Sequence, residues 1–182
     1  MDFGFDGIIN LTTVQGVLQV NLGGSVSPNS CYFSGPIPSS TLRFANTIDY
    51  QVNATDKTWA AGAIYSGLPG IPWNVDVNNT NTDLIINDVR ALRNNLTITD
   101  GRFTLLAGQL SIGGNWTRTN PAGVTVPPCA FVPNTHRVIF DKTGAVDQLI
   151  TCTVIGNTET FYDLEISPAT VNMQLVSGTN VN

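Results

Sequence analysis

Short triplets with an apolar residue at each end recur in this chain at regular intervals. Three of them follow one another at a regular step, at 96–98, 103–105 and 110–112. Two earlier triplets, at 75–77 and 84–86, precede the triplets at 96–98 and 103–105 by about 20 residues each. Apolar residues that alternate with polar ones predict strands with one buried face. When the same apolar pattern comes back after about 20 residues, with three short strands in each such interval (called a return below), the pattern is typical of stacked parallel coils.

The fold class predicted from this spacing is all-β, with a parallel β-solenoid (β-helix) as the main body and loop excursions from it. An antiparallel β-sandwich or jelly roll is the alternative. Such folds rely on tight hairpins, and the chain holds only two Asp-Gly pairs and no Asn-Gly pair. Helical periodicity is nearly absent, and only residues 88–93 have the composition of one or two helical turns.

The regular pattern does not extend over the whole chain. Residues 1–40 are expected to form an irregular N-terminal β region that starts or caps the coils, and residues 41–182 are expected to form the coils. Proline- and glycine-rich segments at 25–40 and at about 115–136 do not keep the repeat, so we expect them to leave the coils as loops. The last residues stop within the pattern, so we expect a segment of a longer protein.

The chain is poor in charge. Only 12% of its 182 residues are charged, and its formal net charge is −5. This balance provides no basic surface, so neither nucleic acid nor anionic lipid is an expected partner. No apolar run approaches the roughly 18 residues of a membrane helix, so membrane insertion is not expected. Neutral polar side chains provide the solubility, which favours an exported protein, extracellular or at the cell surface, whose signal peptide has been removed.

Three cysteines occur, Cys31, Cys129 and Cys152, without a C-x-x-C pair or a nearby histidine, so a zinc site is not expected. The spacing between Cys129 and Cys152 is close to the length of one coil. Stacked strands lie about 4.8 Å apart, so one expectation is a disulfide between these two residues on neighbouring coils. The other is that all three cysteines are small buried residues.

Several motifs between residues 41 and 175 follow one another in a distinctive order. They include NLTITDGRFTL, LSIGGNW, HRVIFDKTG and ETFYDLEI. In this order they resemble the repeat region of large secreted bacterial surface proteins, which are parallel β-solenoid adhesins of the filamentous-haemagglutinin kind. The resemblance implies an extracellular stalk, adhesin or sheath component, and it implies no catalytic residues.

Asp76, Asn78 and Asp83 have a hint of calcium-loop spacing, because Ca²⁺ prefers several oxygen ligands from one short loop. The glycine and glutamate positions of such a loop hold Asn81 and Asn87, so an asparagine-rich turn is the alternative.

A polysaccharide lyase or hydrolase with a β-helix fold is the competing functional class, and it would need clustered carboxylates with an arginine or lysine base. The residues available for that chemistry are Asp76, Asp83, Asp88, Asp100, Arg90, Arg93 and Arg102. We predict no catalytic residues and no cofactor.

Aromatic residues offer a second kind of candidate site. Trp59, Trp73 and Trp116 are candidates for stacking on a glycan, as in a carbohydrate-binding module, and the other interpretation is that they close corners or cap the coils. His136, the only histidine, has no partner for a metal site and is expected in a loop before a strand at 137–140.

These features favour a non-enzymatic extracellular structural or adhesive repeat protein. A solenoid exposes strand edges at its ends, and such edges favour association unless they are capped. We therefore expect self-association from end to end, into a filament, and a glycan, host or neighbouring surface as a second kind of partner.

Overall fold

Strands and their connections make up the described chain. The computed structural model describes residues 8–9, 17–21, 32–33, 41–45, 50–52, 59, 71–119, 129–141, 147–153, 158–167, 172–176 and 179–182. No helix occurs in these residues, and so none of them forms a helix that is long and apolar enough to span a membrane. The all-β class predicted from the sequence is confirmed for the described residues.

The described residues form 17 strands. They are β1 (Ile8–Ile9), β2 (Val17–Asn21), β3 (Tyr32–Phe33), β4 (Thr41–Ala45), β5 (Tyr50–Val52), β6 (Asn74–Asn87), β7 (Arg90–Leu92), β8 (Leu96–Ala107), β9 (Gln109–Ile112), β10 (Trp116–Arg118), β11 (Ala130–Val132), β12 (Arg137–Phe140), β13 (Gln148–Cys152), β14 (Thr158–Glu159), β15 (Asp163–Ile166), β16 (Met173–Leu175) and β17 (Asn180–Val181).

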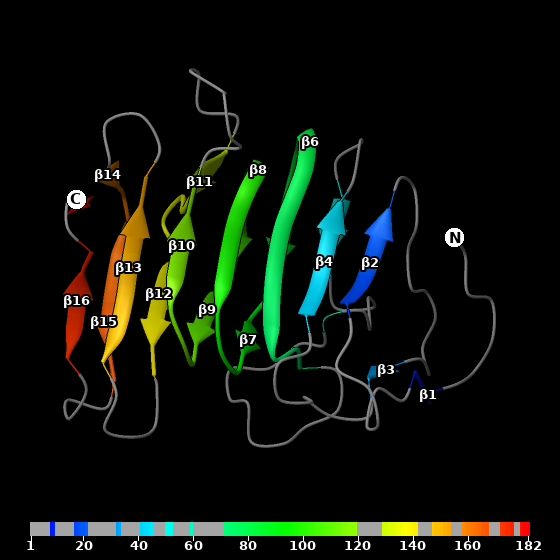
Figure 1. Ribbon diagram of the computed structural model, residues 1–182, viewed down its shortest axis with the longest axis horizontal. Helices are drawn as coiled ribbons and strands as arrows, with labels where there is room; N and C mark the ends of the chain where they lie inside the picture. The colour runs from blue at the N-terminus through cyan, green and yellow to red at the C-terminus, as the bar shows by residue number, and fades with distance from the viewer. Residues whose placement is uncertain are drawn as a thin grey trace.

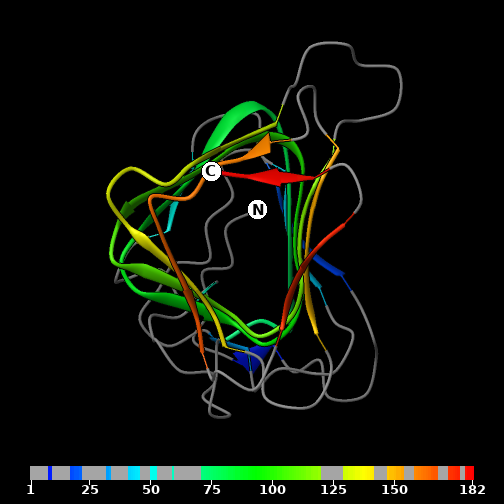
Figure 2. The same ribbon diagram turned by 90° about the vertical axis from the view of Figure 1, so that its left-hand side faces the viewer.

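The largest sheet runs along the molecule in the order β16-β13-β10-β8-β6-β4-β2, with β5 paired to β6 and β11 paired to β8 (Figure 1). A second sheet has the order β15-β12-β9-β7, and two small sheets consist of β1-β3 and β14-β17. Figure 2, which looks along the long axis, shows the two larger sheets on different sides of a shared interior. Every pairing among the described strands is parallel, in contrast to the antiparallel alternative.

The register between neighbouring strands follows the spacing of the apolar triplets. Val75 pairs with Leu96, and Leu84 pairs with Phe103, so each triplet meets the one predicted to return beside it. Leu96 in turn pairs with Trp116, after a return of similar length. In-register parallel neighbours place equivalent positions side by side, so one face of each strand is buried along the whole series.

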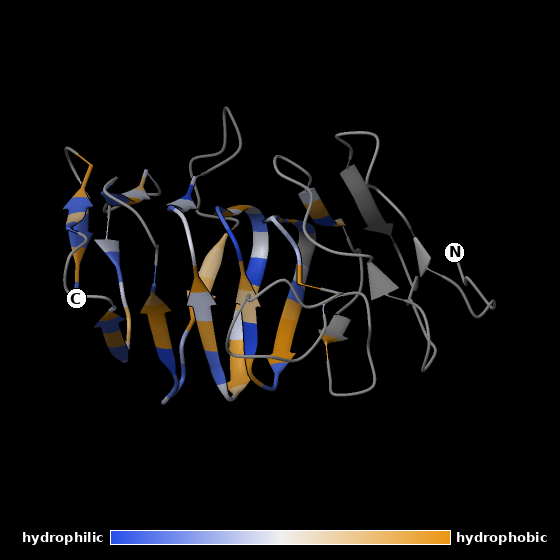
Figure 3. Ribbon diagram, turned by 90° about the horizontal axis from the view of Figure 1, so that it is seen from below, coloured by the Kyte–Doolittle hydropathy of each residue, from blue (hydrophilic) through white to orange (hydrophobic). Residues whose placement is uncertain are grey.

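The core is built from the predicted inward positions. The end residues of the three central triplets are fully buried: Leu96, Ile98, Phe103, Leu105, Leu110 and Ile112. They belong to one apolar cluster that extends from Leu42 to Phe161, and Figure 3 shows apolar (orange) and polar (blue) segments alternating along the strands. Thr97 and Thr99, which alternate with Leu96 and Ile98, are partly exposed. The predicted inside and outside faces are therefore confirmed.

Two glycines occupy positions that other residues would not fit. Gly101 and Gly108 have φ angles of 74° and 77°, in the left-handed region where a side chain is strained. A Cβ atom at Gly101 would also lie 2.7 Å from the Cβ of Asn79, and one at Gly108 would lie 2.4 Å from the carbonyl carbon of Asp88. Figure 2 shows the long strands β6 and β8 curving around the interior, and Gly101 lies within β8.

The prediction of a helical turn at 88–93 was wrong. Residues 90–92 form strand β7, which is fully buried, and Arg90 and Leu92 pair with Leu110 and Ile112 of β9. Arginine, alanine and leucine favour helices when they are free of tertiary constraints, but burial and pairing with a neighbouring strand override this preference.

Several boundaries also differ from the expected ones. The triplets at 75–77 and 84–86 lie in one continuous strand, β6, whose register with β8 shifts between them. Within the expected excursion at 115–136, β10 and β11 are strands of the main sheet, while residues 120–128 lie outside the described residues. In the N-terminal region β2 joins the main sheet by pairing with β4. Residues 22–31, which include Cys31, and 34–40 lie outside the described residues.

Candidate functional site

A column of asparagines marks the starts of three successive strands of the main sheet. Asn74, Asn95 and Asn115 each stand directly before an inward apolar residue. The Oδ1 of Asn74 accepts the N–H of Asn95 at 3.1 Å, and the Oδ1 of Asn95 accepts the N–H of Asn115 at 2.9 Å. The Oδ1 of Asn115 accepts the N–H of Leu149 at 3.0 Å. These side chains thus add hydrogen bonds between strands where the backbone ladder begins.

A shallow polar groove lies on the outer face of the main sheet beside this column. It has a volume of about 290 Å³ and is lined by residues of β4, β6 and β8 and by Asn95. Arg43 and Asp76 form an ion pair in it, with 2.6 Å between Nε and Oδ2, and their side chains are 36% and 14% exposed. Thr97 and Thr99 line the β8 side. The groove therefore offers hydroxyl, amide, guanidinium and carboxylate groups, and its two charges cancel.

The calcium candidates do not share one ligand position. Asp76 pairs with Arg43 of β4, whereas Asp83 pairs with Arg102 of β8, on the opposite side of β6. The Nε of Arg102 lies 2.5 Å from Oδ1 of Asp83, and its Nη2 contacts Oδ2. Asn78 is exposed. Among the described residues no group of three or more His, Cys, Asp or Glu side chains is placed to hold a metal ion.

The remaining charged candidates for carbohydrate cleavage take part in local contacts. Asp100 Oδ1 accepts the N–H of Gly101 at 2.7 Å, and Asp88 Oδ1 accepts the N–H of Val89 at 2.7 Å. Arg90 has no exposed surface, and its Nη1 lies 3.6 Å from Oδ2 of Asp88. These contacts stabilise turns and strand starts, as expected for the structural interpretation of these charges.

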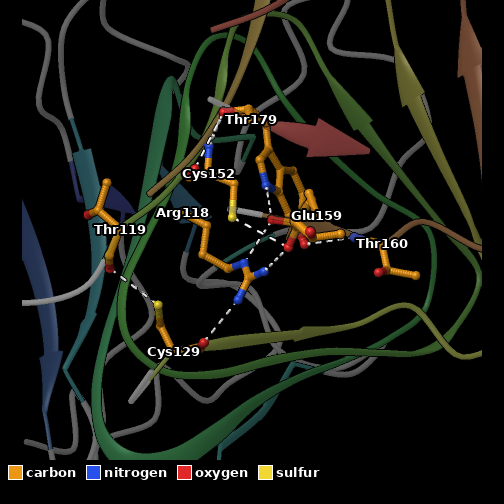
Figure 4. Close-up of polar contacts among 9 residues, drawn as sticks. Arg118, Thr119, Cys129, Cys152, Glu159, Thr160 and Thr179 are labelled. Atoms are coloured by element: carbon orange, nitrogen blue, oxygen red, sulfur yellow. Dashed lines mark hydrogen bonds and ion pairs between the residues drawn. The ribbon is translucent and has the colours of Figure 1, made fainter. Parts of the chain in front are cut away.

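A buried ion pair occupies the interior near the last strands (Figure 4). Arg118 is 9% exposed and Glu159 is 1% exposed. Glu159 Oε2 accepts the Nε–H of Arg118 and the indole N–H of Trp116, each at 2.8 Å. Arg118 also donates from Nη1 to the carbonyl of Cys129 at 3.1 Å and from Nη2 to the carbonyl of Thr158 at 2.7 Å. Burial alone would lower the pKa of Arg118, but the charge and hydrogen bond of Glu159 outweigh it and raise that pKa.

The two described cysteines flank this network as thiols, so the expected disulfide between Cys129 and Cys152 is not formed. Their spacing in sequence does not match the register, because Cys152 pairs with Arg118 while Cys129 immediately precedes β11. Cys129 Sγ donates to the carbonyl of Thr119 at 3.2 Å, and Cys152 Sγ donates to that of Thr158 at 3.5 Å. Burial raises the pKa of the Cys129 thiol, which disfavours the reactive thiolate.

Two of the three tryptophans proposed for glycan stacking belong to the core. Trp59 and Trp116 have no exposed surface, so neither can stack on a ligand from outside. Trp59 donates its indole N–H to the carbonyl of Ala91 at 2.8 Å, and its ring stacks against Phe44. Large aromatic side chains stabilise cores most when they are fully buried and their N–H is satisfied. Trp73 is partly exposed.

His136 lies where it was expected, in the turn between β11 and β12. Its Nε2 lies 2.8 Å from the carbonyl oxygen of Leu106. At the other end of β12, burial raises the pKa of Asp141 to about 6. This carboxyl group therefore binds a proton in the folded protein at a pH where an exposed aspartate would have lost it.

Sequence reasoning missed both the asparagine column and the buried ion pair. The column had a signal, because an asparagine stands directly before the inward residue at 75, at 96 and at 116. The sequence carried no signal for the pairing of Arg118 with Glu159, because the two residues are 41 positions apart and no constant repeat connects them. The Arg43–Asp76 pair, 33 residues apart, was likewise not detectable from spacing.

Two features of the described chain thus qualify as sites, the outer polar groove and the buried Arg118–Glu159 network. The groove is open to a ligand, whereas the network is closed to solvent and joins strands. A search among protein families, curated proteins and solved structures found no match to this chain.

Proposed function

We propose that this chain is a non-enzymatic structural or adhesive protein that acts outside the cell and winds as a parallel β-solenoid. The observation that carries the proposal is the series of seven parallel strands from β2 to β16, paired neighbour to neighbour along the long axis (Figure 1). Along the asparagine column, hydrogen-bonded neighbours on adjacent strands are 20 to 34 residues apart in sequence. These separations support a chain that advances by one coil at each return.

Such a rod resists force because of the direction of its interactions. Hydrogen bonds of a sheet cross from strand to strand, so in a series stacked along the long axis they run along that axis. The apolar cluster is shared by successive strands, and the asparagine column adds side-chain hydrogen bonds between them. A pulling force along the rod has to break several hydrogen bonds of one pairing together.

Exposed apolar side chains gather at the end of the strand series. Of the four large hydrophobic side chains exposed in the described residues, three are Tyr162, Ile166 and Leu175, at 64%, 42% and 50%. β15 and β16 are the terminal strands of their sheets. An unpaired edge with apolar side chains favours the addition of another strand. These features support end-to-end association of copies of the chain into a filament.

The composition of the chain supports an extracellular location, and the contacts of its aspartates support a non-enzymatic role. A chain with 12% charged residues that relies on Asn, Thr and Ser for solubility suits an extracellular location. The order of motifs, which resembles that of secreted bacterial surface repeats, supports the same location. The aspartates that a polysaccharide-cleaving enzyme would use are instead held in ion pairs and turns, which supports a non-enzymatic role.

Small-angle X-ray scattering at rising protein concentration, with electron microscopy of the same samples, tests this proposal. We expect an elongated particle whose length grows with concentration. An Ile166→Lys/Leu175→Lys double variant should remain a single rod, because charges at the edge oppose strand addition. Leu106→Lys, at an exposed position of β8, is the matched control and should assemble as the unmodified chain does. A compact particle, or a strict monomer at high concentration, would contradict the proposal.

A further inference from the structure

We propose that the outer face of the main sheet binds a neutral oligosaccharide, with the groove at β4, β6 and β8 as its principal subsite. The inference deepens the proposed adhesive function and rests on it, because it names the class of ligand that an adhesive rod would hold. It is carried by the hydrogen-bonding groups of the groove, by their charge balance and by the row of polar side chains that continues from it.

The groove presents donors and acceptors that the described residues do not satisfy. Toward the described residues Arg43 uses only its Nε–H, which donates to Asp76, out of the five N–H donors of a guanidinium. The Asp76 side chain is 14% exposed and can be reached from the groove, whereas its Oδ1, which has no hydrogen-bond partner in the described residues, is itself buried. Asn95 uses Oδ1 to accept from Asn115, and within the described part of the chain no partner is found for its Nδ2 or for the Thr97 hydroxyl. A sugar hydroxyl both donates and accepts, so one hydroxyl matches a guanidinium and a carboxylate together.

The charge of the groove favours a neutral ligand over an acidic one. Arg43 and Asp76 are the only charged residues among its described lining residues, and they lie 2.6 Å apart. A uronate or sulfated sugar attracted to the guanidinium would also meet the carboxylate, and a like charge next to the ligand opposes its binding. A neutral polyol forms hydrogen bonds with both groups without displacing either charge.

The polar groove continues into a straight row of outward side chains. In-register pairing places Arg43, Asp76, Thr97, Thr117 and Thr151 at equivalent positions of β4, β6, β8, β10 and β13. Their neighbours within each strand are buried, so this row faces outward. Four steps of about 4.8 Å give a row of about 19 Å, which accommodates several linked sugar rings lying across the strands.

The size of the groove indicates weak binding of each single ring. Its volume of about 290 Å³ is at the lower limit for small-molecule sites. No aromatic side chain is found among its described lining residues, so hydrogen bonds rather than stacking provide the affinity. A long glycan that engages the whole row, or several copies of the chain in one filament, would bind more tightly through multivalency.

NMR titration of the full chain with isotope labelling tests the inference. The probes are neutral hexasaccharides (cellohexaose, mannohexaose, xylohexaose and hexa-N-acetylchitohexaose), with hexagalacturonate as the charged comparison. We expect at least one neutral probe to shift the amide signals of residues 43, 76, 95 and 97. Thr97→Val should weaken this binding roughly 5- to 10-fold, because it removes one hydrogen bond while keeping the shape of the side chain.

Two further variants keep the test interpretable. Arg43→Gln/Asp76→Asn removes both charges together and should also weaken binding, whereas Thr135→Val, at an exposed turn away from the groove, should bind as the unmodified chain does. The inference is overturned if no neutral probe shifts these signals, if hexagalacturonate binds more tightly than the neutral probes, or if Thr97→Val binds unchanged. Scattering on the same samples separates the two proposals, because an elongated, assembling rod that binds no sugar overturns only this inference. A compact, non-assembling chain that binds sugar at residues 43–97 overturns only the proposed rod.

Discussion

The middle of the molecule, from β6 to β10, and its last part, from β11 to β17, use parallel pairing with different interiors. In the middle, side chains that bond across adjacent strands lie 19 to 22 residues from their partners in sequence, and the inward ends of the central triplets are all apolar. In the last part the corresponding separations rise to between 25 and 34 residues. There Gln148 and Glu159 are buried in the interior, and Glu159 pairs with Arg118 at the end of β10.

The difference shows what a longer return requires. Additional residues between paired strands bring additional backbone carbonyls to the interior, and buried carbonyls need donors. Arg118 donates to the carbonyls of Cys129 and Thr158, which lie at the starts of β11 and β14, and Gln148 donates to those of Ile112 and Gly114. The middle region also buries polar side chains, among them Asn79 and Arg90. In the last part the buried polar side chains donate to backbone carbonyls of other strands and connections.

The largest effect is expected from removing the charge that balances Arg118. Glu159→Ala should lower the free energy of unfolding by about 3–5 kcal/mol, because it leaves a buried guanidinium and the indole N–H of Trp116 without their acceptor. Chemical denaturation measures the change. Glu165→Ala, which removes an exposed partner of Arg137, is the matched control and should have little effect. Equal effects of the two variants would contradict the role assigned to the buried pair.

A cavity in the middle region should be the next most damaging change. Leu105→Ala is expected to lower the free energy of unfolding by about 2–5 kcal/mol, because Leu105 is fully buried in the apolar cluster. Thr99→Ser on the outer face of the same strand should change it little, since serine keeps the hydroxyl that bonds the carbonyl of Val77. Similar thermal melts for both variants would show that the inward and outward faces are assigned incorrectly.

A pH effect should distinguish the last part of the molecule. The pKa of Asp141 is raised from 3.8 to about 6 by burial, so between about pH 4 and pH 6 the folded state retains a proton that the unfolded state releases. The free energy of unfolding therefore falls as the pH rises through this window, by less than about 3 kcal/mol, because solvent screening reduces the effect at this partly exposed carboxyl group. Asp141→Asn should remove this part of the pH dependence. A variant whose stability changes with pH as that of the unmodified chain does would rule out Asp141 as its source.

The smallest expected effect concerns the asparagine column. Asn95→Ala should lower the free energy of unfolding by about 1–2 kcal/mol, because the N–H of Asn115 loses its acceptor at 2.9 Å. Asn78→Ala, an exposed asparagine of β6, is the control and should be nearly neutral. If the two variants have the same Tm, the column does not stabilise the stacking of strands.

The regular middle region was largely predictable from the sequence. The triplets at 75–77, 84–86, 96–98 and 103–105 define both the register and the buried face, because alternation and a constant return are local signals. The prediction failed at 88–93, where helix-forming residues are held as a strand by burial and pairing. Local propensity cannot detect such a tertiary effect.

Contacts in the last part were not predictable for a different reason. Returns of changing length remove the constant spacing that would place Arg118 next to Glu159 or show that Cys129 and Cys152 are out of register. Aromatic composition alone also could not distinguish core tryptophans, such as Trp59 and Trp116, from ligand-stacking ones. The groove depends on pairing across 33 residues, between Arg43 and Asp76, so it too required the fold.

The central claim, parallel stacking in register, is tested most directly by cross-strand NOE contacts in NMR spectra of the full chain. We predict contacts between the backbone protons of Thr97 and Thr117 and between those of Thr117 and Thr151, which pair in register across β8, β10 and β13. Close Hα–Hα contacts between strands that are consecutive in sequence, as in antiparallel hairpins, would contradict it.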